Sequence, residues 1–183
     1  KECPDYDTYN KFNFIYGHLP YEIIPLLNKK FLKVSLIRDP IERAFSHFNW
    51  MINRGYCSKY DNLQNLFDEN KISKNTITNQ FSGVGYTNAN SDESLSLAYE
   101  NLSKNIDLLY SSNDIFYLIA DIISLYNLPD VLIQNQQESK YEQTLKEGSF
   151  NNIIKNNNGM DIELFEQLKK NKIFLKKINK KNL

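Results

Sequence analysis

The sequence predicts an α/β fold in which helices flank a mostly parallel sheet. The apolar, β-branched segment 31–37 leads directly into an amphipathic segment with helix-start signals. A second apolar segment, 106–110, leads in the same way into a helical pattern at 114–128. Strands that alternate with helices are typical of parallel sheets. The length of 183 residues, without repeats or a long linker, predicts a single domain over 1–183.

The first expected elements are short. Segment 12–18 alternates in polarity and predicts a strand that stops at Gly17. Segment 21–27 predicts a turn or a short helix, interrupted by Pro25. Segment 31–37 is the clearest strand of the sequence.

The helix after this strand has strong start signals. Asp39 is expected at the N-cap and Pro40 at the first helical position, and Glu42 has the spacing of a capping box. The expected buried stripe consists of Ile41, Phe45, Phe48 and Ile52.

The middle of the chain predicts fewer regular elements. Residues 53–90 are polar and turn-rich, and we expect them to be irregular. A helix is expected over 92–105 and a strand over 106–110. Ser111 or Ser112 is the expected cap of the next helix.

The C-terminal part predicts two helices separated by an irregular segment. The first covers 114–128, and a loop or short strand follows over 127–140. The last helix covers about 161–178, with Asp161 and Glu163 in its first turn, where the helix dipole favours acids.

The composition excludes several classes of protein. The chain has 22 basic and 22 acidic residues, so no bulk charge attracts nucleic acid. Cys3 and Cys57 are too few for a disulfide framework and do not have zinc-site spacing. No apolar run approaches the roughly 20 residues of a membrane span.

Arg38 and Ser46 are the candidate anion-binding residues. Arg38 follows a strand and precedes a helix N-terminus, a position where α/β proteins bind ligands and where a guanidinium suits phosphate. Ser46 lies outside the expected buried stripe, so its hydroxyl can face the same ligand. The alternative is an ion-paired surface arginine and a serine without a role. Arg43 is expected to pair with Asp39 or a neighbouring acid.

The chain has two histidines. His18 follows Gly17 at the end of an expected strand and can act as a general base, or it is a turn residue bonded to the backbone. His47 lies within an aromatic helix and is expected to be a packing residue. Neither has the neighbours of a metal site.

Four sequence blocks follow one another along the chain: "FIYGHLPYEI", "KVSLIRDPIERAFSHFNWM", "LAYENLSKNIDLLYSSNDI" and "GMDIELFEQLKKN". In this order they resemble the carbohydrate sulfotransferases, above all the heparan sulfate/dermatan 2-O-sulfotransferases and their bacterial relatives. The resemblance covers about residues 12–172. Its most specific part is the RDPxxRxxS pattern that contains Arg38 and Ser46, with a Gly-His pair upstream.

The resemblance implies a P-loop-NTPase-like fold and a sulfuryl donor, 3′-phosphoadenosine-5′-phosphosulfate (PAPS), with no metal. Arg38 and Ser46 would hold the 3′-phosphate of the donor. His18 would be the base that acts on a hydroxyl of a carbohydrate acceptor. Lys140, in "NQQESK", resembles more loosely a segment that closes over the nucleotide.

The chain departs from the family in two places. No Gly/Lys/Thr-rich phosphate loop is present, so we expect the first strand and this loop to lie upstream of Lys1. Tyr110 stands where relatives often have glycine. The missing loop leaves an alternative open, a degenerate relative that binds an anion or glycan without catalysis. Another phosphate-handling enzyme such as a kinase ranks last, because paired magnesium-binding acids are not evident.

The expected compartment follows from the same features. The low cysteine count and the absence of an apolar anchor favour the bacterial cytoplasm. For a eukaryotic enzyme, the resemblance implies the Golgi lumen.

Overall fold

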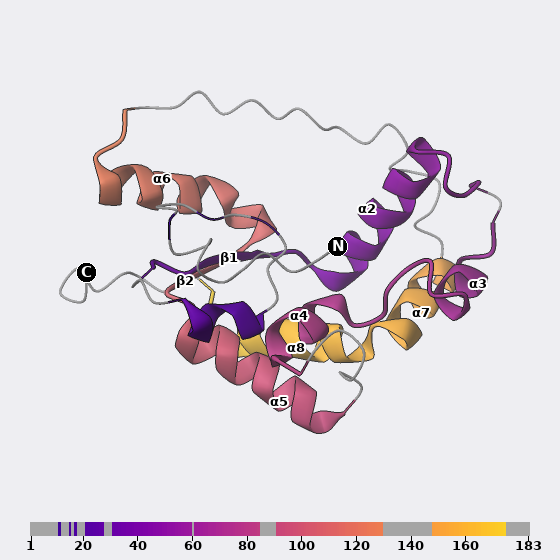
Figure 1. Cartoon of the computed structure of the whole chain (residues 1–183). Coiled ribbons are helices and arrows are strands. Elements are labelled where there is room, and N and C mark those ends of the chain that lie inside the picture. The colour runs from indigo at the N-terminus through magenta and orange to yellow at the C-terminus, as the bar shows by residue number, and fades with distance from the viewer. Residues whose placement is uncertain are drawn as a thin grey trace.

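Helices surround one small parallel sheet in the computed structural model (Figure 1). The structure describes residues 11, 15, 17, 21–27, 31–59, 61–84, 91–129 and 148–174. The strands are β1 (Val34–Ile37) and β2 (Leu108–Ser111). The α-helices are α2 (Pro40–Asn53), α3 (Leu63–Asp68), α4 (Thr76–Ser82), α5 (Asp92–Glu100), α6 (Ile115–Tyr126), α7 (Gly148–Asn157) and α8 (Gly159–Lys170). Tyr21–Leu26 and Ser112–Asp114 are 3₁₀-helices, and Asn101–Asn105 is a π-helical turn.

The two strands confirm the α/β class with parallel pairing. Val34 lies opposite Leu108, and Ile37 lies opposite Ser111. Before the strands, the Lys33 carbonyl accepts a hydrogen bond from the Leu108 N–H at 3.1 Å, and the Lys33 N–H donates to the Asp107 carboxylate at 2.7 Å. The predicted strand over 12–18 lies mostly outside the described residues, and neither Ile15 nor Gly17 is in a strand.

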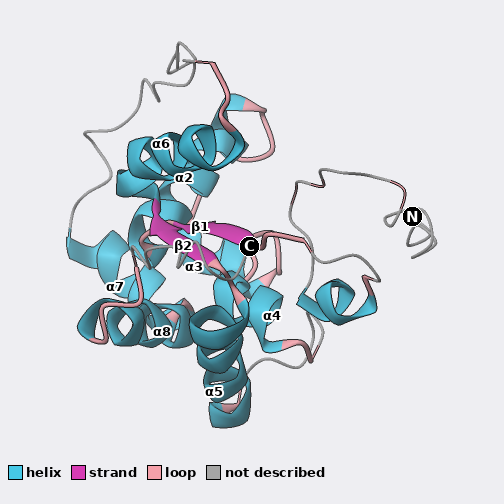
Figure 2. Ribbon diagram, turned by 90° about the vertical axis from the view of Figure 1, so that its left-hand side faces the viewer, coloured by secondary structure: helices cyan, strands magenta, loops and turns pink. Residues whose placement is uncertain are grey.

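The sheet lies between two helical layers (Figure 2). Leu108 and Tyr110 of β2 pack against Leu118 of α6 on one face. Leu109 of β2 and Ile37 of β1 join the core formed by α4, α5 and α8 on the other face. This alternation follows from the period of two in a strand, and it buries β2 on both faces.

Helix α2 begins as the sequence predicts. The Asp39 carboxylate accepts hydrogen bonds from the N–H groups of Ile41 (2.9 Å) and Glu42 (3.2 Å), and Pro40 is the first helical residue. Phe48 is fully buried as expected. The rest of the buried face is rotated from the predicted stripe, because Ala44 and Met51 are buried more deeply than the other stripe positions, which are only partly buried.

The expectation of an irregular segment over 53–90 was wrong. Helices α3 and α4 lie within this segment, and they are too short to give a clear periodic pattern. Their stability comes from packing, since Leu66 and Phe67 lie in the core beneath α2. Helix α7 was also not predicted from its Asn-rich sequence.

Several element boundaries differ from the predictions, those of the strands included, because β1 begins at Val34 and β2 covers Leu108–Ser111. The helix expected over 92–105 ends in the π-helical turn. Ser111 caps the 3₁₀-helix before α6, where its hydroxyl accepts a hydrogen bond from the Asn113 N–H at 3.4 Å. Helix α8 ends at Lys170, because Lys172 adopts a left-handed conformation with φ 53°. The segment expected as a loop or strand over 127–140 lies outside the described residues beyond 129.

Helices α4 and α8 cap each other, an arrangement that we call the reciprocal cap. The Asp161 carboxylate of α8 accepts hydrogen bonds from the N–H groups of Ile77 (3.0 Å) and Thr78 (2.7 Å) in α4. In return, the side-chain oxygen of Asn75 accepts a hydrogen bond from the Met160 N–H at 3.2 Å. Asp161 lies in the first turn of α8 as predicted, but its carboxylate accepts the N–H groups of the first turn of α4, and the residue is 1% exposed.

Helix α6 presents large apolar side chains to solvent. Phe116 and Tyr117 are each 65% exposed, and Leu118 is its buried residue. Within the described ranges, no helix has both the length and the apolar composition that crossing a bilayer requires.

Candidate anion-binding site at the start of α2

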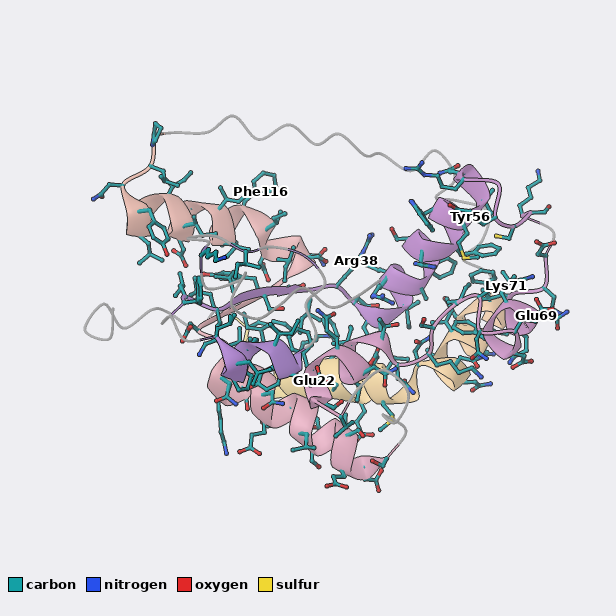
Figure 3. All side chains as sticks on the ribbon, viewed as in Figure 1. Glu22, Arg38, Tyr56, Glu69, Lys71 and Phe116 are labelled. Carbon is teal, nitrogen blue, oxygen red and sulfur yellow. The ribbon has the colours of Figure 1, made fainter. Side chains whose placement is uncertain are left out.

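The candidate site lies where β1 passes into α2. Ile37 ends the strand in the core at 3% exposure, and Asp39 caps the helix two residues later. Arg38 stands between them with its side chain 44% exposed. Figure 3 shows this side chain pointing outward from the junction of the strand and the helix. The backbone therefore fixes where the guanidinium starts and leaves its end accessible.

Arg38 already has one partner. Its Nε lies 3.6 Å from Oε2 of Glu42, one turn along α2, and both side chains are largely exposed. Exposed ion pairs of this kind contribute about 0–1 kcal/mol to stability. A phosphate group can therefore displace Glu42 at little cost to the fold.

The local charge limits what Arg38 can do alone. The single positive charge of Arg38 stands beside two carboxylates, those of Asp39 and Glu42. The Asp39 carboxylate also takes the N–H groups of Ile41 and Glu42, which are often the anion-binding groups at a helix start. An anion bound here consequently needs a second donor besides Arg38.

Ser46 is the second donor that the sequence suggests. It is half-buried and lies seven residues after Asp39, about two helical turns, so both residues lie on the same side of α2. The axial separation from Pro40 to Ser46 is about 9 Å at 1.5 Å per residue. Among the described residues, no hydrogen bond joins the side chains of Arg38 and Ser46. A ligand that contacts both must bridge this distance.

The residues around Ser46 have other roles. His47 packs its ring against Trp50, with centroids 5.6 Å apart, which supports the packing role expected for it. Burial lowers the pKa of His47, and the nearby charge of Arg43 lowers it further. Arg43 was expected to pair with Asp39 or a neighbouring acid. Burial raises the pKa of Asp161, and the charge of Arg43 is among the influences that oppose this rise.

Two sequence-predicted residues, His18 and Lys140, lie outside the described residues. The structure thus places the two candidate donors for an anion but not the candidate base. Within the described part of the chain, no group of three or more His, Cys, Asp or Glu side chains is arranged to hold a metal ion.

The sequence did not predict a second surface feature on α2, a pocket at its C-terminal end. The pocket has a volume of about 320 Å³ and is lined by His47, Trp50, Met51, Tyr56 and Lys71. The signal that would have found it is "NRGY", in which a glycine after the helix turns the chain back and returns Tyr56 to the helix end.

Comparison with known proteins gives no match to a family model, to a curated protein or to a solved structure.

Proposed function

We propose that the chain is a sulfotransferase that moves a sulfuryl group from PAPS to a hydroxyl of a carbohydrate, within a P-loop-NTPase-like fold. The observation that carries the proposal is the position of Arg38 at the carboxyl end of a parallel strand, immediately before a capped helix. Ligands of open α/β sheets bind at such ends. The resemblance of four sequence blocks to carbohydrate sulfotransferases supports the same conclusion.

In this proposal, Arg38 and Ser46 hold the 3′-phosphate of the donor. The guanidinium offers several N–H donors in a planar fork, and the hydroxyl adds one more on the same side of α2. The phosphate replaces Glu42 as the partner of Arg38. This exchange suits the geometry, because the Arg38–Glu42 pair is exposed and long at 3.6 Å.

His18 is the proposed base for the acceptor hydroxyl. An imidazole titrates near neutral pH and can take the proton as the oxygen attacks the sulfur. In-line sulfuryl transfer spreads charge over the equatorial oxygens, so most of the catalysis comes from positioning and electrostatic stabilisation. The proposed acceptor is a glycan hydroxyl, and the proposed compartment is the bacterial cytoplasm.

Calorimetric titration with adenosine 3′,5′-bisphosphate tests the donor site. Arg38→Ala is expected to weaken binding by about ten-fold or more, because it removes a charge-assisted hydrogen bond. Ser46→Ala is expected to weaken it by about three-fold. Lys104→Ala is the matched control, because Lys104, in the π-helical turn after α5, also forms an exposed i,i+4 ion pair, with Glu100. Equal affinities for Arg38→Ala and the wild type would refute the donor site.

A transfer assay with radiolabelled PAPS and a mixture of desulfated glycans tests the catalytic role. His18→Ala is expected to abolish transfer while calorimetry shows unchanged nucleotide binding. Undiminished transfer by this variant would remove His18 from the mechanism. Nucleotide binding without transfer in the wild type would instead support the non-catalytic, anion-binding alternative.

A further inference from the structure

The pocket at the C-terminal end of α2 is the feature that the proposed function does not use. It has a volume of about 320 Å³ and lies at the other end of α2 from Arg38. Its lining combines a buried residue, Met51 at 5% exposure, with two exposed aromatic side chains, Trp50 at 47% and Tyr56 at 64%. A pocket with aromatic walls and few polar groups is the usual form of a small-ligand site.

Backbone geometry fixes both sides of this pocket. Helix α2 ends in a Schellman motif: the Tyr56 N–H donates to the Met51 carbonyl at 2.9 Å, and the Gly55 N–H donates to the Ile52 carbonyl at 3.0 Å. Gly55 has φ +72°, a conformation that glycine adopts without strain. The motif turns the chain back, so Tyr56 lies against the end of α2.

Helix α3 ends in the same motif and contributes the opposite side. The Lys71 N–H donates to the Leu66 carbonyl at 2.9 Å, and the Asn70 N–H donates to the Phe67 carbonyl at 3.1 Å. Asn70 takes the left-handed position with φ 55°. Tyr56 and Lys71 therefore hold equivalent positions after two helices, and Figure 3 shows them on the same side of the molecule. The positions of Tyr56 and Lys71 in the lining are therefore fixed by the backbone hydrogen bonds of the two motifs.

The rings of His47, Trp50 and Tyr56 form a row, in which Trp50 contacts the other two. The ring centroids of His47 and Trp50 are 5.6 Å apart with a tilt of 42°, and those of Trp50 and Tyr56 are 5.4 Å apart with a tilt of 44°. Burial lowers the pKa of His47, which favours its neutral form at pH 7. The row therefore presents uncharged rings whose faces carry partial negative charge.

One polar pair borders the row. The Lys71 ammonium lies 2.7 Å from the Glu69 carboxylate, and both side chains are more than half exposed. The ammonium offers N–H donors and the carboxylate offers acceptors within one short contact. Because the pair neutralises itself, the border attracts groups that both donate and accept hydrogen bonds more than it attracts net charge.

We propose that this pocket binds a neutral pyranose ring of a glycan. One face of a pyranose carries C–H groups with partial positive charge, which match the faces of Trp50 and Tyr56. Its edge carries neighbouring hydroxyls that both donate and accept, which match the Lys71–Glu69 pair. The proposal does not depend on the proposed sulfotransferase activity, because it uses none of its residues.

Nucleic acid fits this pocket less well than a pyranose. A nucleic-acid strand needs free cations for its phosphates, but the lysine in the lining is already paired with Glu69. A nucleobase is flat and can stack fully on only one ring of a row tilted by 42° and 44°. A proline-rich peptide also uses aromatic grooves, and it is therefore a test arm below.

The sequence contains one tryptophan, so the intrinsic tryptophan fluorescence of the full chain reports on this pocket directly. The wild type is titrated with cellohexaose, chitohexaose and maltohexaose at millimolar concentrations. At least one of them is expected to change the Trp50 emission in a saturable way. The affinity is expected to be nearly independent of salt, because no ion pair with the ligand forms.

Variants measured by calorimetry test the residues. Trp50→Ala and Tyr56→Ala are each expected to weaken binding of the hexasaccharide that gives the fluorescence response by about ten-fold or more. Tyr56→Phe keeps the ring and is expected to weaken this binding by about three-fold or less. Phe116→Ala is the matched control, because Phe116 is an exposed aromatic residue on α6 at 65% exposure. Circular dichroism checks that each variant folds.

Oligothymidylate and decaproline are titrated in the same way, as a nucleic-acid strand and a proline-rich peptide. Three outcomes would overturn the proposal: no saturable response to any of the three sugars, equal sugar affinity in Trp50→Ala and the wild type, or a response only to oligothymidylate or to decaproline. Titration of the same samples with adenosine 3′,5′-bisphosphate separates this result from the proposed function. Loss of sugar binding with nucleotide binding kept refutes only the pocket. Loss of nucleotide binding with sugar binding kept refutes only the donor site.

Discussion

Two helix starts in this protein are held by an aspartate in the same way, but in opposite surroundings. Asp39 accepts from two backbone N–H groups of its own helix, α2, within three residues. Asp161 accepts from two N–H groups of a different helix, α4, across 83 and 84 residues. Asp39 is only partly buried and stands beside Arg38, whereas Asp161 is 1% exposed.

The difference shows that one hydrogen-bond pattern can serve two purposes. At α2 the cap is open to water, and a ligand can approach the cation next to it. In the reciprocal cap the Asp161 carboxylate is buried, so its hydrogen bonds hold α4 and α8 together and a ligand cannot reach it. Burial raises the pKa of Asp161, while the two N–H donors act in the opposite direction. Both caps use an aspartate, so it is the exposure of the cap and not the residue type that distinguishes the candidate binding site from the structural contact between α4 and α8.

Asp161→Ala is expected to give the largest effect, a loss of about 2–4 kcal/mol in the free energy of unfolding, because it leaves two buried N–H groups unpaired. Urea denaturation measures it. Asp92→Ala is the control, since Asp92 is an exposed acid in the first turn of α5 and should cost under about 1 kcal/mol. Equal losses in the two variants would contradict the structural role of Asp161.

The pH dependence of stability distinguishes the buried cap in a second way. Because folding raises the pKa of Asp161 above its ordinary value of 3.8, the folded protein binds this proton more tightly than the unfolded chain. The stability that the protein gains from binding this proton is therefore complete when the pH is below the ordinary value, and it is lost as the pH rises through the raised pKa. The stability of the wild type relative to Asp161→Asn is expected to increase as the pH falls from 7 to 4. A constant difference would argue against a raised pKa.

Asp39→Ala is expected to cost about 1 kcal/mol, less than Asp161→Ala, because water can reach the N–H groups that it releases. The same denaturation experiment measures this change. Asp39→Ser keeps an oxygen acceptor at the cap and should recover most of the loss. A loss as large as that of Asp161→Ala would show that the exposed cap and the buried cap are energetically alike.

Glu42→Gln is expected to change stability least, by under about 0.5 kcal/mol, because it removes only an exposed ion pair. Its main effect should be on binding. With the competing carboxylate gone, Arg38 should bind adenosine 3′,5′-bisphosphate about two- to five-fold more tightly. Weaker binding in calorimetry would mean that Glu42 positions the guanidinium for the ligand.

The same comparison explains what could be predicted from the sequence. The start of α2 was predicted correctly, because Asp39, Pro40 and Glu42 signal a helix through residues that are adjacent in the chain. The start of α4 was not, because its partners lie in α8. Short helices such as α3 and α4 depend on packing against distant segments, and a local pattern carries little information on such contacts.

Of the two sites described on α2, one was predicted from the sequence and the other was not. Arg38 and Ser46 were identified from local order along one strand and one helix. The pocket beside Trp50 was not predicted, because Lys71 reaches it only when α3 ends next to α2. Its two Schellman motifs are local signals, but the second uses Asn70 in place of glycine, which makes it hard to recognise.

The reciprocal cap also has a consequence for the order of folding. A ribosome releases the chain from the N-terminus, so α4 emerges more than eighty residues before the carboxylate that completes its first turn. Until then, the first turn of α4 must be satisfied by solvent. The first amides of α4 and α8 should therefore gain protection from hydrogen exchange together, as a late and cooperative event in folding.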